Sequence, residues 1–564
     1  MKLYKIFTIL FLVTAFGACT DKFEEINTKP DAFYTDEVSG KFFMTNPQFN
    51  LFGPNRFPYW RAQLIHADRY SGHVCFGHNG SWWSDELGYS YHSAYTDATW
   101  GWLEGYLGNL DNFMKLVDTG GEFENEYMYA MGLIMKGLYY QMFTDVFGMI
   151  PYTEAADPDI VTPSFDTQMT IYKGVIAELD EAIQIIGDAE RTGVGVDDAG
   201  ENDLYYGGEL QKWKKLANTL KLRMALRALD ADGDDFASAA ITEALSGPLM
   251  ESEGDNCLME KDAEISQWGS AAYGDIWHNF GTGSDWTLGK TLIDLLRDEN
   301  DPRLSKYAKP AKGGMTEFEK PDGEEGDLFL TRVEFILDGL DEAGVDYTRT
   351  DQADTLVIVD MPLSTYYVGQ PTRLNDKTYP FSEYDFFSTP ADFVIQRKND
   401  GKPIAPEIVM LTSEAYFLRA EAAVRGFGGD ANALYQDGIR HAMAVWEVSS
   451  AEADDYIANS SFGMLNGSMD ENLEKIATQR WIAAFTDGFE AWAIVRDSGY
   501  PMVLAEGVSD VDIFGLGDIN GAYPQRMRYG NQTWNNNGDN TQEAVNIQGA
   551  DRQDTKLWWA KIND

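Results

Sequence analysis

The stretch YMYAMGLIMKGLYYQMFTDVFGMIP, residues 127–151, carries the clearest structural signal in the chain. Starting from Tyr127, apolar residues recur every three or four positions, at Met131, Ile134, Leu138 and Met142. This spacing predicts a helix with one buried face. Ala130 and Gly137 are small enough to let a second helix approach closely. Gly148 is expected to end the helix, and Pro151 prevents its continuation.

The same helical period returns at several places along the chain. It predicts helices at 168–187, 209–229, 236–246, 411–425, 430–446 and 473–484, with a further helix starting at Asp487. Asp487 and Glu490 have the spacing of a capping box, which satisfies amide groups at a helix start. Helix pairs of this length predict a mainly α fold of tetratricopeptide-like units in a right-handed scaffold, although no strict period of about 34 residues is present.

Long stretches without a helical period separate these pairs, at 46–100, 247–290, 306–400 and 500–564. They are rich in Gly, Pro, Asn, Asp and aromatic residues, and excursions of this length in a compact protein commonly carry function. We expect a few short strands among them, for example at TLVIVDMPL (355–363). The predicted architecture is a helical scaffold with long loop-rich insertions that build a ligand face.

The N-terminal segment predicts export and lipid anchoring. Two lysines precede a short apolar core, and Gly17 and Ala18 lead directly to Cys19. Residues 1–18 therefore fit a bacterial lipoprotein signal peptide, with Cys19 as the lipid-bearing first residue of a single domain over 19–564. An ordinary secretory signal with an incidental cysteine is the alternative.

Composition limits the ligands. The chain has 91 acidic against 44 basic residues and a formal net charge of −47, which argues against nucleic acid, heparin-like chains and other polyanions. Hydrophobic residues make up 44% and aromatic residues 13%, which is typical of a globular protein rather than an acidic disordered tail. No second long apolar run follows the signal, so only the lipid is expected to enter a membrane.

Patterns for catalysis and metal binding are weak. The sequence contains no G-x-S-x-G, P-loop or H-E-x-x-H pattern, and we expect no enzyme activity. HVCFGH (73–78) fits no familiar zinc spacing, and DADGDD (230–235) lacks the glycine and glutamate of an EF-hand. We therefore expect no metal site and no cofactor, although adventitious calcium is compatible with so acidic a surface. Cys75 and Cys257 allow a disulfide, but two buried free thiols are the plainer interpretation.

Two aromatic-rich stretches, 77–102 and 266–286, supply the candidate ligand-binding residues. Sugars present patches of C–H bonds that stack on electron-rich rings. The candidates are Trp82, Trp83, Tyr89, Trp268, Tyr273, Trp277 and Trp286. Four of them, Trp82, Trp83, Trp268 and Trp277, are expected to form one exposed platform with the other three behind it; packing beneath the loops is the alternative. A ligand with little or no charge should then bind with little dependence on salt.

Segments along nearly the whole chain resemble the SusD/RagB family of outer-membrane nutrient-binding lipoproteins. They are FEEINTKPDAF (23–33), GLYYQMFTDVFGMIPYTEA (137–155), KLANTLKLRMALR (215–227), DPRL (301–304), EAYFLRAEAAVRGFGGDANALYQDGIRHAM (414–443), QRWIAAFTDGFEAWAIVRDSGYP (479–501) and the tail from PQRMRY to TKLWW (524–559). Gly530 and Thr533 stand where the family commonly has proline and glutamate, which indicates a divergent branch.

The resemblance implies a surface lipoprotein that captures a glycan, or in some members a peptide. Such a protein sits as a lid on a TonB-dependent, SusC-like transporter of the outer membrane and passes the ligand to it. Asp21, Glu24 and Glu25 resemble the acidic tag that sends lipoproteins to the cell surface, with a solvated tether as the alternative. A surface adhesin or structural lipoprotein is the third interpretation of the chain.

Overall fold

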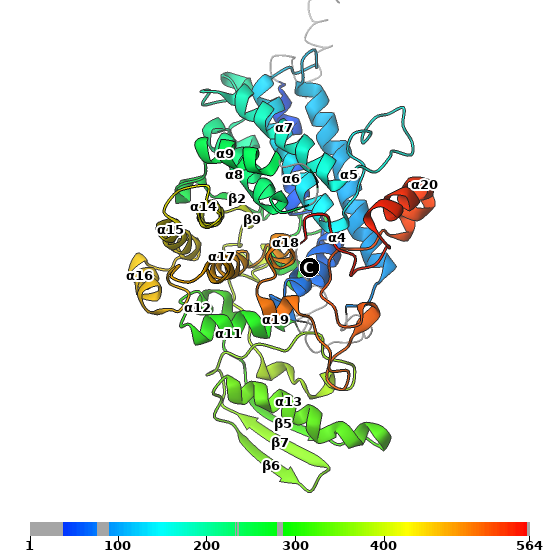
Figure 1. The fold of residues 1–564 in the computed structure, drawn as a ribbon, viewed down its shortest axis with the longest axis vertical. Helices are drawn as coiled ribbons and strands as arrows, with labels where there is room; N and C mark the ends of the chain where they lie inside the picture. The colour runs from blue at the N-terminus through cyan, green and yellow to red at the C-terminus, as the bar shows by residue number, and fades with distance from the viewer. Residues whose placement is uncertain (1–37, 76–88, 232, 234–235, 279–285, 561–564) are drawn as a thin grey trace, which may run out of the picture.

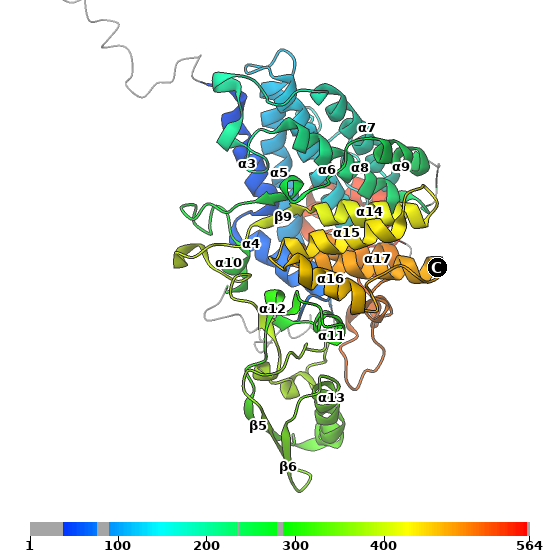
Figure 2. The ribbon, with the colours of Figure 1, turned by 90° about the vertical axis from the view of Figure 1, so that its left-hand side faces the viewer.

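The computed structural model of the chain describes residues 38–75, 89–231, 233, 236–278 and 286–560, and it is dominated by helices (Figure 1). Helices from 126–246 lie toward one end of the long axis, and helices from 412–498 lie in the middle, at the level of the helix at 56–59 (Figures 1 and 2). A small sheet with one helix lies at the other end. The mainly α fold agrees with the prediction.

The first half of the chain is mainly helical. Its helices are α3 (Thr45–Phe52), α4 (Arg56–Tyr59), the π-helix η3 (Trp60–Asp68), α5 (Ser93–Val117), α6 (Glu126–Phe147), α7 (Gln168–Ile186), α8 (Leu210–Ala228) and α9 (Phe236–Ser246). α6 packs against α5, α7 and α8. A Cβ at Gly137 would lie 3.0 Å from Leu179 of α7 and 3.3 Å from Leu220 of α8, so this glycine allows the three helices to meet.

The second half of the chain continues the scaffold. Its helices are α10 (Tyr273–Trp277), α11 (Lys290–Asp298), α12 (Leu304–Tyr307), α13 (Phe329–Glu342), α14 (Thr412–Val424), α15 (Ala431–Ala444), α16 (Ser450–Asn459), α17 (Met469–Ala483), α18 (Gly488–Ser498), α19 (Met502–Ala505) and α20 (Asn531–Gln548). α14 packs against α15 and α17, and α17 packs against α18. The helices predicted from periodicity are all present, with ends that differ by at most four residues. Among the described residues, no helix is long and apolar enough to cross a membrane.

The strands are short and all their ladders are antiparallel. They are β1 (Val74–Cys75), β2 (Cys257–Met259), β3 (Thr287–Leu288), β4 (Ala308–Lys309), β5 (Gly314–Glu319), β6 (Thr348–Gln352), β7 (Leu356–Met361), β8 (Thr389–Pro390) and β9 (Glu407–Met410). The largest sheet has the order β5–β7–β6, with β7 within the stretch predicted as a strand. Val357 and Val359 of β7 point toward α13 and form a separate small core with Phe329 and Val333.

All four stretches predicted as irregular contain helices, and 247–290 includes the short helix α10. Residues 46–100 include η3, which the search for a 3.6-residue period missed because a π-helix has a different period. Residues 306–400 include α13, whose apolar face was overlooked, and residues 500–564 include α20. α20 is rich in Asn, a poor helix former, so its sequence gives little signal.

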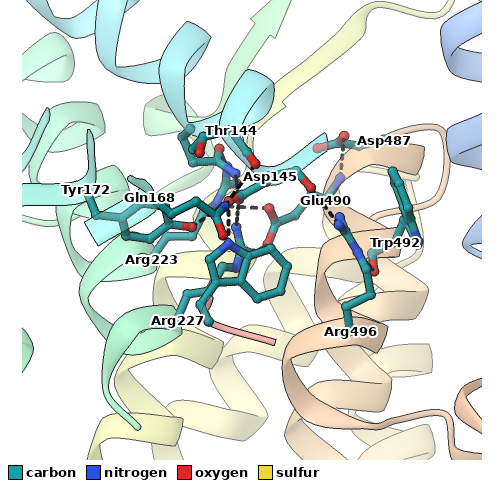
Figure 3. Close-up of polar contacts among 12 residues, drawn as sticks. Thr144, Asp145, Gln168, Tyr172, Arg223, Arg227, Asp487, Glu490, Trp492 and Arg496 are labelled. Carbon is teal, nitrogen blue, oxygen red and sulfur yellow. Dashed lines mark hydrogen bonds and ion pairs between the residues drawn. The ribbon is translucent and has the colours of Figure 1, made fainter. Parts of the chain in front are cut away.

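A buried group of charged residues joins the two halves of the scaffold at its centre (Figure 3). Arg227 of α8 pairs with Asp145 of α6 at 2.6 Å and with Glu490 of α18. Asp145 also accepts hydrogen bonds from Tyr172 of α7 at 2.6 Å and from the indole of Trp559 at 2.8 Å. Helices α6, α7 and α8 and the C-terminal segment therefore meet at the Asp145 carboxylate, and α18 joins them through the pair of Glu490 with Arg227.

Glu490 is the second carboxylate of this group. Its pKa would be raised by burial alone, but the charges of Arg223 and Arg227 lower it below the usual value. The predicted capping box is therefore only half correct. Asp487 does cap α18 by accepting a hydrogen bond from the Glu490 backbone N–H at 3.2 Å. The Glu490 side chain instead pairs with the arginines. A buried guanidinium without a carboxylate costs more free energy than a backbone N–H without a cap at a helix start.

Replacing Arg227 with Met should destabilise the protein by about 3–5 kcal/mol, because Asp145 and Glu490 then lose a buried partner. Arg440→Met is the matched control: Arg440 lies on the surface and pairs with exposed Asp437 and Asp454, so its loss should cost under about 1 kcal/mol. Urea unfolding of the three proteins measures both values. Equal urea midpoints for the two variants would show that the buried ion pairs stabilise the protein no more than the exposed ones.

Asp487 should make stability depend on pH. Burial, with the nearby charge of Glu490, raises the pKa of Asp487 to about 7. The folded protein therefore holds this proton up to about pH 7, whereas the unfolded chain loses it near pH 4. The stability that this group contributes is complete below pH 4 and is lost as pH rises to 7.

Asp487→Asn keeps the oxygen that caps α18 and removes the charge. The variant should exceed wild type in stability at pH 8 by roughly 2 kcal/mol, since Asp487 keeps some contact with water, and the difference should vanish near pH 4. Thermal melts of both proteins across pH 4–8 test this. Parallel curves over the whole range would contradict it.

Candidate ligand-binding face

The structure separates the seven candidate aromatic residues into three groups. Trp82 and Trp83 lie outside the described residues. Trp268 is exposed, with 57% of its surface accessible. The other four, Tyr89, Tyr273, Trp277 and Trp286, are buried. The expectation that Trp277 lies on an exposed platform is therefore wrong: the short helix α10 turns this ring into the core, where 1% of its surface is accessible.

Tyr89, Tyr273 and Trp286 were expected behind the platform and do lie beneath the surface. The Tyr89 hydroxyl donates to the backbone oxygen of Arg69 at 3.0 Å, and the Tyr273 hydroxyl donates to Asp68 at 2.9 Å. Buried rings with such internal bonds support the surface above them but present no face to a ligand. Of the described candidates, Trp268 alone can stack on a ligand directly.

The loop that carries Trp268 is held in place by backbone contacts on both sides. The Arg56 N–H donates to the Gln267 oxygen at 3.0 Å, and the Ala271 N–H donates to the Pro54 oxygen at 2.8 Å. Lys398 donates from its ammonium group to the Ser270 oxygen at 2.6 Å. Burial, with the nearby charge of Lys261, lowers the pKa of Lys398 to about 8. The ring of Trp268 therefore stands on a fixed backbone.

Phe57 is the neighbour of Trp268 on this surface. It belongs to α4, whose start is capped by Asn55 through a hydrogen bond from the Phe57 N–H. Its ring is 42% exposed and lies 5.4 Å from the Trp268 ring, at an angle of 50°. Two exposed rings from residues far apart in the sequence thus form a tilted pair.

The row of rings continues along the π-helix η3. The guanidinium of Arg61 lies 5.6 Å from the Phe57 ring, 5.9 Å from the Trp60 ring and 5.6 Å from the Tyr95 ring. Tyr95 stacks in turn on His92 at 4.2 Å. We call Trp268, Phe57, Arg61, Tyr95 and His92 the ring row. Residues 76–88, which contain Trp82 and Trp83, stand between Arg61 and His92 in the chain.

Sequence reasoning found Trp268 and missed Phe57 and Arg61. The segment FPYWR (57–61) lies in a stretch predicted as irregular, and no pattern in it predicts a contact with Trp268. Its mixture of aromatic rings with an arginine was the available signal, because such residues are enriched at binding surfaces.

The cysteines and histidines near this face have structural roles. Cys75 and Cys257 are both buried thiols that form no disulfide, which confirms the plainer interpretation. Burial lowers the pKa of His66 and His73 to about 3, so both rings are neutral. Each ring bonds a backbone oxygen, that of Arg61 and that of Trp481. Within the part of the chain that the structure describes, no group of three or more potential ligands could hold a metal ion.

Comparison with known families identifies the chain. The model of the SusD-like family with the description "Starch-binding associating with outer membrane" matches residues 35–324 and 357–530. The chain belongs to this SusD-like family. The SusD/RagB resemblance is thereby confirmed. The family model leaves out residues 325–356, which contain α13 and the edge strand β6.

Solved structures share the SusD-like fold over nearly the whole chain. A chitin-binding protein is 24% identical with a TM-score of 0.70, covering 93% of this chain and 100% of its own. A SusD-like protein from Bacteroides thetaiotaomicron is 25% identical with a TM-score of 0.67, covering 92% and 98%. A chitin-binding SusD homologue from Flavobacterium johnsoniae is 21% identical with a TM-score of 0.69, covering 92% and 98%. Comparison with curated proteins gives no match.

Proposed function

We propose that this SusD-like protein is a lipid-anchored protein of the cell surface that binds a glycan and delivers it to a TonB-dependent, SusC-like transporter. The observation that carries glycan binding is the exposed pair of Trp268 and Phe57 in a chain of a family described as starch-binding. Two proteins of similar fold are named for chitin binding, which supports a saccharide as the ligand class.

The geometry of the pair suits a sugar. Both rings are exposed on one surface, and each stands on a backbone that the core holds in place. A pyranose ring can lay its C–H face on one indole while its hydroxyls meet neighbouring polar groups. Because the pair does not enclose a pocket, several sugar units of one chain can pass over it. Affinity from a few rings should be modest, in the micromolar to millimolar range.

The binding proposal can be tested with single alanine variants. Trp268→Ala and Phe57→Ala should each weaken binding of the cognate oligosaccharide about fivefold, or about 1 kcal/mol per ring, without lowering the melting temperature, because both rings are exposed. Phe42→Ala is the matched control: this ring is 50% exposed on a separate element, η2 (Gly40–Phe43), and its loss should leave affinity unchanged.

A glycan array identifies the oligosaccharide, and calorimetry measures its affinity for the four proteins. A parallel peptide library provides the opposing result. Binding of peptides with no binding of any glycan would reject the proposal and favour a peptide ligand. Binding of a glycan that neither variant weakens would place the site elsewhere on the surface.

Attachment and partner can be tested in one preparation from the native membrane. Wild type should stay in the membrane fraction and, in mild detergent, co-purify with a large β-barrel transporter. Cys19→Ser should move to the soluble fraction with its fold intact, because the lipid is lost. Palmitate that still enters the Cys19→Ser protein would refute the anchor, and recovery of wild type alone in several gentle detergents would refute the partner.

A further inference from the structure

We infer that the surface formed by Trp268, Phe57 and Arg61 binds a saccharide that bears a uronic-acid carboxylate, and that Arg61 is the residue that receives this group. The inference rests on the proposed glycan binding and adds the class of glycan. It differs from the sequence-based expectation, which was a ligand of little charge and binding insensitive to salt. The observations that carry it are the surroundings of Arg61.

Among the described residues, no carboxylate holds Arg61. The structure gives its guanidinium no ion pair and no hydrogen bond within those residues, and its Nε is buried without an acceptor. By contrast Arg223, Arg227 and Arg303 each hold a carboxylate. Arg528 resembles Arg61, since its buried Nε also lacks an acceptor and its guanidinium lies 3.9 Å from the Tyr91 ring, but it is Arg61 that contacts Phe57 of the exposed pair.

Aromatic rings take the place of carboxylates around Arg61. Three rings, those of Phe57, Trp60 and Tyr95, lie within 5.9 Å of its guanidinium. Rings of this kind stabilise a cation through their electron-rich faces but accept none of its N–H groups in ordinary hydrogen bonds. The charge of Arg61 is thus held in place without being neutralised. Because its Nε is buried, the N–H groups of its two terminal nitrogens are the donors left for a ligand.

A carboxylate is the group that fits these donors best. The guanidinium is planar and offers parallel N–H groups, which match the two oxygens of a carboxylate in a bidentate pair. A sugar hydroxyl would accept only one such bond, and without charge. Because Phe57 contacts both Arg61 and Trp268, a sugar stacked on the ring pair would bring a carboxylate of the same or the next unit to Arg61.

A second cation and the local backbone support this assignment. The Arg56 guanidinium lies 5.2 Å from the Trp268 ring, so a positive group stands on each side of the exposed pair. Arg61 lies in the nine-residue π-helix η3, and π-helical segments are rare and frequently occur at functional sites. A regular α-helix would set Arg61 at a different angle to Phe57 and Tyr95.

The net charge of the protein limits how acidic the ligand can be. At −47 the chain as a whole repels polyanions, which excludes a saccharide with a carboxylate on every unit as a tight ligand. At physiological salt, repulsion from distant charges is screened over about 8 Å, whereas direct contact with Arg61 is not. A largely neutral chain with scattered uronic acids meets both conditions.

The test uses pairs of oligosaccharides that differ only in the acidic group: fragments of glucuronoxylan and of a glucuronic-acid gum, each with its carboxyl-reduced counterpart. Wild type should bind at least one acidic fragment ten or more times tighter than its reduced form. Arg61→Gln should remove this preference, and Arg61→Lys should retain part of it. Arg440→Gln, at an exposed arginine paired with Asp437 and Asp454, should behave as wild type.

The ratio between the acidic and reduced ligands is measured within each variant, so a partial loss of fold cancels. An unchanged ratio in Arg61→Gln overturns the inference, as does equal binding of the paired ligands by wild type or the absence of binding to every acidic fragment. If neutral glycans still bind through Trp268 in that case, the inference fails but the proposed function is supported. Failure of all glycans, acidic and neutral, would reject both.

Discussion

The fold depends on the buried pairing of Arg227 with Asp145 and Glu490 (Figure 3). Charges without water need partners at close range, so α6, α8 and α18 can meet in only one arrangement. Apolar contacts alone tolerate small shifts of one helix along another, whereas these pairs do not. The contact of Asp145 with Trp559 also draws the C-terminal segment to the same point, 414 residues along the chain. We infer that the network fixes the relative position of the two halves.

The ligand face takes its position from this centre through a short series of contacts. α18, which carries Glu490, packs against the π-helix η3. A Cβ at Gly488 would lie 2.2 Å from a carboxylate oxygen of Asp68, so the start of α18 touches η3 directly. Asp68 accepts a hydrogen bond from the hydroxyl of Tyr273 in α10. This helix follows the loop that carries Trp268. The buried tyrosine thus links the exposed ring to the core.

Sequence periodicity predicted the helices whose one apolar face packs on a neighbour, such as α7 and α14, and the order of family segments predicted the fold. It failed where the period changes, at η3, and where composition opposes the structure, at α20. At the ligand face, composition indicated Trp268, but it could not separate this ring from Trp277, which a single turn of helix directs inward. Phe57 and Trp268 are more than two hundred residues apart in the sequence, so no local pattern predicts their contact.

The way Arg61 is held explains how so acidic a protein can keep a positive site at its surface. A carboxylate beside Arg61 would stabilise the cation but cancel its charge toward any ligand. Aromatic rings stabilise it by about 0.5–2 kcal/mol and leave the net charge in place. Trp60 and Tyr95 are buried, so Phe57 is the ring of these three that also presents a face to a ligand. In the proposed function Phe57 therefore serves both the sugar and the cation, whereas Trp60 and Tyr95 serve the cation alone.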